Sequence, residues 1–90
     1  MEIDNEVKIA MVTAASQALD YQAKNPNADS EEIIRYIMKE LRVKGDEKVG
    51  AIVGASRALK EKQKTNRPNK IIIQEIMDQS NEILMSIGEN

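Results

Sequence analysis

Apolar side chains recur along most of this chain at steps of three and four residues, the spacing of one face of an α-helix. In the first such stretch they are Ile3, Val7, Ala10, Met11, Ala14, Ala15 and Ala18, with Gln22 continuing the same face. A residue that precedes a proline is disfavoured in helical geometry. We therefore expect the first helix to end near Lys24, ahead of Asn25 and Pro26.

A second helix is predicted to begin after Asp29, whose side chain can cap the first turn. Glu32, three residues later, completes the pattern of a capping box, and Glu31 lies favourably near the positive end of the helix dipole. The apolar face of this helix is Ile33, Ile34, Ile37, Met38 and Leu41.

Gly45 interrupts the pattern, and a third helix is expected to open at Asp46 and Glu47. Its buried positions are predicted to be Val49, Ile52, Val53, Ser56 and Leu59. After the loop TNRPN at 65–69, a fourth helix is predicted from about 70 to 87, with Gly88 as its C-terminal stop. The segments AIVGA and KIII are rich in β-branched residues, so strands are an alternative there. Because both lie inside longer stretches of helical period without hairpin turn residues, helix is favoured.

Two segments forty residues apart are nearly the same. KIAMVTAASQAL, from Lys8, aligns without a gap with KVGAIVGASRAL, from Lys48. After a change of one residue in loop length, IIRYIM at 33–38 then matches IIQEIM at 72–77. We interpret this as the duplication of a helical hairpin, with repeat 1 at about 3–43 and repeat 2 at about 46–88. Convergence of two similar amphipathic helices is the alternative.

Two hairpins are too few for a stacked solenoid, but each can cover the apolar face of the other. The expected fold is a single all-α domain over residues 1–90, a four-helix assembly with pseudo-twofold symmetry between the copies. Small residues at every fourth position predict a flat ridge along which the first and third helices approach closely. These residues are Ala10, Ala14 and Ala18 in one copy and Gly50, Gly54 and Ala58 in the other. A groove for a ligand or a partner helix is the alternative use of this ridge.

The chain contains no cysteine and no histidine. Thiolate nucleophiles, disulfides, Cys-ligated zinc and every Ser-His arrangement are therefore excluded. Adjacent acidic residues occur at 31–32 and at 46–47, but both pairs stand at predicted helix starts, where neighbouring side chains point in different directions. We expect these pairs to act as caps, and we expect no enzymatic activity, no metal site and no cofactor.

No segment of the sequence is long enough and apolar enough to suggest a membrane span. Purely apolar runs, such as the one at 71–73, are far shorter than the roughly 20 residues that a spanning helix needs. The first residues, MEIDNEV, are acidic where a secretory signal is basic. A cytoplasmic protein without membrane contact is therefore expected.

Charge is unevenly distributed between the two copies. Residues 57–70 carry six basic side chains against the single Glu61, a net charge of +5, whereas residues 17–32 carry Lys24 against four acidic side chains, a net charge of −3. We select Arg57, Lys60, Lys64, Arg67 and Lys70 as candidates for binding an anionic or acidic partner. Cations near the end of the third helix complement its dipole, but those at the start of the fourth oppose it. An ordinary solvated loop is the alternative.

These features favour a small non-enzymatic interaction or accessory protein that acts through protein contacts. A homodimer is favoured because the fourth helix has more apolar residues than one face holds, with Ile71 and Met85 off the main stripe. Weak binding to a nucleic-acid backbone through the same basic loop is the alternative. It is disfavoured by the acidic chain, with net charge −2 and pI about 5.2, and by aromatic residues limited to Tyr21 and Tyr36.

Overall fold

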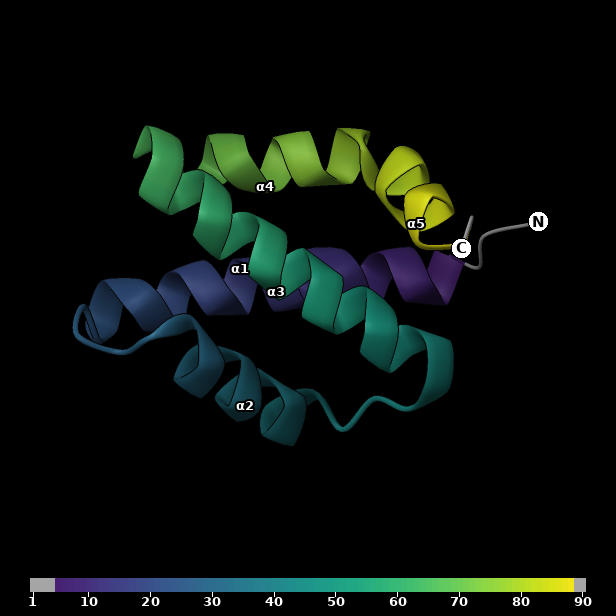
Figure 1. Cartoon of the computed structure of the whole chain (residues 1–90), viewed down its shortest axis with the longest axis horizontal. Helices are drawn as coiled ribbons and strands as arrows, with labels where there is room; N and C mark the ends of the chain where they lie inside the picture. The colour runs from purple at the N-terminus through teal and green to yellow at the C-terminus, as the bar shows by residue number, and fades with distance from the viewer. Residues whose placement is uncertain (1–4, 89–90) are drawn as a thin grey trace.

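The computed structural model describes residues 5–88. Within this range the chain forms five helices and no strand (Figure 1): α1 (Asn5–Lys24), α2 (Ser30–Leu41), α3 (Gly45–Thr65), α4 (Asn69–Asp78) and α5 (Ser80–Gly88). The all-helical prediction is confirmed, and the segments AIVGA and KIII lie in α3 and α4. Ile3, expected on the first helix, lies outside the described residues.

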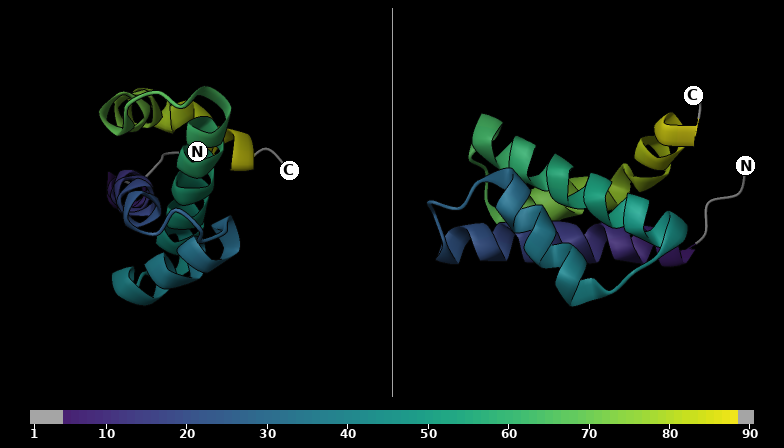
Figure 2. Two further views of the ribbon diagram at one scale, coloured as in Figure 1. Left: turned by 90° about the vertical axis from the view of Figure 1, so that its left-hand side faces the viewer. Right: turned by 60° about the horizontal axis from the view of Figure 1, so that its bottom comes forward.

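α1 and α3 cross at the centre of the molecule and run in the same general direction (Figure 1). α2 lies on one side of this crossing and α4 on the other, and each packs against both central helices. The turn between α1 and α2 and the turn between α3 and α4 lie at the same end of the molecule, as the further views also show (Figure 2).

The contact between α1 and α3 is made through backbone and small side chains. A Cβ atom added at Gly54 would lie 2.1 Å from the carbonyl oxygen of Met11, and one added at Gly50 would lie 2.8 Å from Cγ1 of Val7. Glycine is required at Gly54 because any side chain would overlap the backbone of the other helix. The predicted close approach is confirmed, and this part of the small-residue ridge is occupied inside the molecule.

The predicted buried face of α3 is only partly correct. Leu59 is buried as expected, but Val49 is 45% exposed and Ser56 is exposed. The buried residues of α3 are instead Gly50, Ala51, Gly54, Ala55, Ala58 and Leu59. The physical reason is the close crossing with α1, because only small residues fit at the point of contact. The larger Ile52 and Val53 are left half-buried at its edges.

The predicted fourth helix is interrupted, which is a second correction. α4 ends at Asp78, Gln79 has φ −98° and ψ 7°, and α5 begins at Ser80. Asp, Ser and Asn, the residue types at 78, 80 and 81, have side chains that can hydrogen-bond to the nearby backbone and therefore favour helix ends over helix interiors. The change of direction brings α5 against α1, where Ile83 is buried.

The buried apolar side chains form two clusters. One surrounds Ile33 and Ile37 of α2 and also contains Ala10, Ala14, Ala18, Ala51, Ala55 and Leu59. The other surrounds Ile72 and Ile76 of α4 and also contains Met11, Ala15, Leu19, Ala58 and Ile83. Since α1 and α3 contribute to both clusters, their crossing joins the two halves of the core.

The start of α2 was correctly predicted. Asp29 is the N-cap, and its Oδ1 accepts a hydrogen bond of 2.8 Å from the backbone N–H of Glu32. The carboxylate of Glu32 accepts a hydrogen bond from the hydroxyl of Tyr21 at 3.3 Å, instead of the capping-box bond expected from the sequence. This bond ties α2 to α1 near the turn that connects them.

Candidate partner-binding surface

Three of the five candidate residues lie together on α3. Arg57, Lys60 and Lys64 are spaced by three and four residues, so their side chains share one helix face, and all three are exposed. Lys70 is exposed in the first turn of α4. We call these four residues the basic surface.

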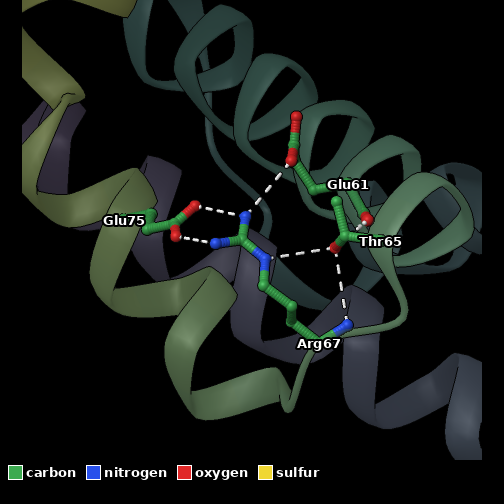
Figure 3. A network of polar contacts seen from close by, with 4 residues as sticks. All are labelled: Glu61, Thr65, Arg67 and Glu75. Carbon is green, nitrogen blue, oxygen red and sulfur yellow. Dashed lines mark hydrogen bonds and ion pairs between the residues drawn. The ribbon is translucent and has the colours of Figure 1, made fainter.

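Arg67, the fifth candidate, is engaged within the chain. Its guanidinium donates through both Nη atoms to the carboxylate of Glu75, with 2.6 Å from Nη2 to Oε2, and Nη2 also lies 3.5 Å from Oε2 of Glu61. Nε donates to the hydroxyl of Thr65 at 3.2 Å (Figure 3). The hydrogen bond to Glu75 is the main cause that raises the pKa of Arg67 above its ordinary value, against the opposing effect of desolvation. Arg67 therefore holds α4 to α3, and its charge is compensated by two carboxylates.

In the first hairpin, the two positions that align with Glu61 and Glu75 join the helices by a different kind of contact. Glu61 corresponds to Tyr21 at an offset of forty residues, and Glu75 corresponds to Tyr36 at an offset of thirty-nine. The rings of Tyr21 and Tyr36 are in contact, with centroids 4.5 Å apart. Desolvation, followed by the nearby Glu32 carboxylate, raises the pKa of Tyr21. The first hairpin therefore has an aromatic pair at the aligned positions where the second has two carboxylates bound by a guanidinium.

Lys62 has a structural role in the turn between α3 and α4. Its Nζ donates a hydrogen bond of 2.8 Å to the carbonyl oxygen of Arg67, and the side chain is half-buried. Lys62 is one of the cations near the end of the third helix that were expected to complement its dipole, together with Lys60 and Lys64. In the structure Lys62 is separated from them, because it points toward the turn while they face solvent.

The basic surface has no ion-pair partner among residues 5–88. The residues aligned with Lys60, Lys64 and Lys70 in the first hairpin do have ion-pair partners. Asp20 and Lys24, which correspond to Lys60 and Lys64, form an ion pair of 3.2 Å. Glu31, which corresponds to Lys70, pairs with Arg35 at 3.3 Å. Lys60 and Lys64 are instead like charges four residues apart, an arrangement that destabilises a helix by about 0.2–0.5 kcal/mol.

A groove of about 690 Å³ separates the two turns at this end of the molecule. Its lining includes equivalent residues of the two copies, such as Leu19 with Leu59 and Gln22 with Lys62. Asn69, the first residue of α4, also lines the groove, and its Oδ1 is buried without a hydrogen-bond partner among the described residues. The end of the molecule is therefore hollow, with both apolar and polar groups on its walls.

The described residues contain no group of three acidic side chains placed to hold a metal ion. None of their helices is long and apolar enough to cross a membrane, and the cytoplasmic location stays a prediction. Ile71 and Met85, expected off the main apolar stripe, are 45% and 55% exposed.

No protein-family model, curated protein or solved structure matches this chain. The functional argument therefore depends on the placement of its own residues.

Proposed function

We propose that this chain is a small non-enzymatic interaction protein, built from two copies of one helical hairpin, that binds an acidic partner through its basic surface. The carrying observation is that Lys60 and Lys70 are placed where they weaken the fold, Lys60 four residues from the like charge of Lys64 and Lys70 at the positive end of α4, and that neither has an ion-pair partner in residues 5–88. An acidic partner would compensate both.

The composition of the two core clusters supports the duplication. Shifting Ala51, Ala55 and Leu59 of the first cluster back by forty residues gives Met11, Ala15 and Leu19 of the second. Shifting Ile33 and Ile37 forward by thirty-nine residues gives Ile72 and Ile76. Residues of one cluster thus align with residues of the other. A twofold axis through the crossing of α1 and α3 would account for this, because it would place each residue in the environment of its counterpart.

The position of the basic residues relative to the helix ends supports binding. Cations are favourable only within the last turn of a helix, which in α3 covers Lys62 and Lys64. Arg57 and Lys60 lie earlier in α3, and Lys70 lies at the positive end of α4, where the first turn contains no acidic residue. Helix stability therefore explains Lys64 and leaves Arg57, Lys60 and Lys70 for recognition.

An acidic protein surface fits this arrangement better than a nucleic acid. The cations cover a short stretch, Arg67 is already neutralised, and α4 and α5 contain no Lys or Arg after Lys70. A helix that reads DNA grooves would need further basic or polar side chains along its length. Contact with a phosphate backbone stays the alternative that the experiment below separates.

The test is capture from native extract at low ionic strength, with the full chain as bait. The variant Lys60→Glu/Lys70→Glu reverses two of the four charges of the basic surface and so removes its net positive charge, and Lys39→Glu/Lys44→Glu makes the same charge change at exposed positions near the end of α2. We expect the wild type and the control variant to retain the same acidic protein and the reversed variant to lose it. Equal capture by all three would overturn the proposal. Salt-sensitive binding of a labelled DNA duplex, lost only in the reversed variant, would replace it by the nucleic-acid alternative.

A further inference from the structure

Opposite charges lie at the same end of this molecule. The exposed acidic residues Asp20, Asp29, Glu31 and Glu32 surround the turn between α1 and α2, and we call them the acidic surface. Lys60, Lys64 and Lys70 of the basic surface are exposed near the turn between α3 and α4, which lies at the same end of the molecule (Figures 1 and 2). The two surfaces are therefore neighbours on one protomer, and both are exposed to solvent.

The two surfaces match in position as well as in sign. Asp20 and Lys60 are equivalent positions on α1 and α3, and Glu31 and Lys70 are equivalent positions on α2 and α4. If the hairpins share one backbone geometry, the spacing of the two acidic groups equals the spacing of the two basic groups. A second copy of the chain therefore carries an acidic surface of the size that the basic surface requires.

We infer that the acidic partner is a second copy of this chain, docked end to end so that the acidic surface of each protomer contacts the basic surface of the other. The inference depends on the proposed function, since it names the partner of the same site. Such a contact is isologous: one twofold rotation forms both charged contacts at once and closes the assembly as a dimer.

The ion pairs already present on the acidic surface do not prevent this contact. The side chains of Asp20 and Lys24 are 66% and 73% exposed, and those of Glu31 and Arg35 are 83% and 73% exposed. Exposed pairs of this kind contribute little to stability, so their carboxylates can accept further cations at small cost. Asp20 and Glu31 are thus available to Lys60 and Lys70 of another copy.

The groove between the turns supplies the apolar part of the contact. Its lining includes Leu19, Leu59 and Pro26, together with Asp29 of the acidic surface. Complementary charge mainly gives specificity and a fast association rate, whereas affinity requires the burial of apolar and polar groups. End-to-end docking covers the groove and removes these side chains from water.

A charge-swap experiment tests this pairing. The basic-reversed variant is Lys60→Glu/Lys70→Glu, and the acid-reversed variant is Asp20→Lys/Glu31→Lys. In either variant alone like charges meet at both designed contacts, position 20 with position 60 and position 31 with position 70. We therefore expect the Kd of self-association to rise about a hundredfold or more, measured by analytical ultracentrifugation. When the two variants are mixed, each surface meets its opposite, and a heterodimer is expected. Lys39→Glu/Lys44→Glu should dimerise like the wild type, and circular dichroism would verify that every variant is helical.

The results separate this inference from the proposed function. A mixture that stays monomeric, or a reversed variant that dimerises like the wild type, would overturn the pairing of the acidic with the basic surface. Suppose that the pairing is overturned in this way, but that the wild type captures another acidic protein and the basic-reversed variant does not. The proposed function then stands, and only the inference that the partner is a second copy is wrong. Weakening of the wild-type dimer by added salt is expected, and a dimer insensitive to salt would contradict the charge pairing.

Discussion

Replacing Gly54 with alanine tests whether α1 and α3 are in backbone contact. The new Cβ would lie 2.1 Å from the carbonyl oxygen of Met11 and 2.8 Å from its carbonyl carbon. Carbon and oxygen atoms in close weak contact are about 3.3–3.6 Å apart. The two helices would therefore have to separate locally by about 1 Å or more. A rotamer change cannot relieve the overlap, because the carbonyl group belongs to the backbone.

The expected cost follows from two opposing effects. Overpacking of a well-packed core typically costs about 1–3 kcal/mol, and here the separation also weakens dispersion contacts on both sides of the crossing. Alanine gains about 1 kcal/mol over glycine in helix propensity. Because the obstacle is backbone, we take the upper end of the packing cost and expect Gly54→Ala to lower the unfolding free energy by about 2 kcal/mol.

Urea unfolding followed by circular dichroism measures this change, and an unchanged m-value would show that the transition is the same. Ser56→Ala, at an exposed position of α3, is the matched control for propensity and should be neutral or slightly stabilising. Gly50→Ala should cost less than Gly54→Ala, because its nearest obstacle is the Val7 side chain at 2.8 Å. If Gly54→Ala is as stable as the wild type, the crossing is not a backbone contact.

Three further predictions follow from individual contacts. Lys70→Glu should raise the unfolding free energy by about 0.3–1 kcal/mol in urea, because it places an anion at the positive end of α4, and a loss would contradict the dipole argument. Asp29→Ala should lower it by about 0.5–2 kcal/mol by removing the cap bond to Glu32, with Asn27→Ala, at an exposed position in the same turn, as the neutral control. The raised pKa of Tyr21 means that its stabilising effect is present below about pH 10 and lost as the pH rises through the folded-state pKa. Tm should therefore fall less steeply above about pH 10 in Tyr21→Phe than in the wild type, and parallel curves would refute this.

Much of the fold could be predicted because the local signals were strong. Apolar spacing located the helices, Pro26 marked the end of the first, and Asp29 marked the start of the second. The prediction for α3 assumed that its large apolar residues are the buried ones. It therefore placed Val49 in the core, whereas the structure buries the neighbouring Gly50. A close helix crossing reverses the usual preference for large side chains, and the repeated glycines were the available signal.

The candidate site was predictable only in part. The exposed cations of α3 follow from sequence spacing alone, but the ion pair of Arg67 with Glu75 joins residues eight positions apart across a turn whose geometry the sequence does not specify. Comparison of the two copies could have indicated it, because Glu61 and Glu75 replace the tyrosines of the first hairpin. The break at Gln79 had no glycine or proline to mark it.

An experimental structure of the chain would test the duplication most directly, because the matching charges depend on equivalent positions in the two copies. We predict that residues 8–38 superimpose on residues 48–77, with Ile33 placed on Ile72 and Tyr21 on Glu61. A best superposition displaced by a helical turn, or hairpins that differ in the angle between their helices, would contradict the internal symmetry and the end-to-end pairing inferred from it.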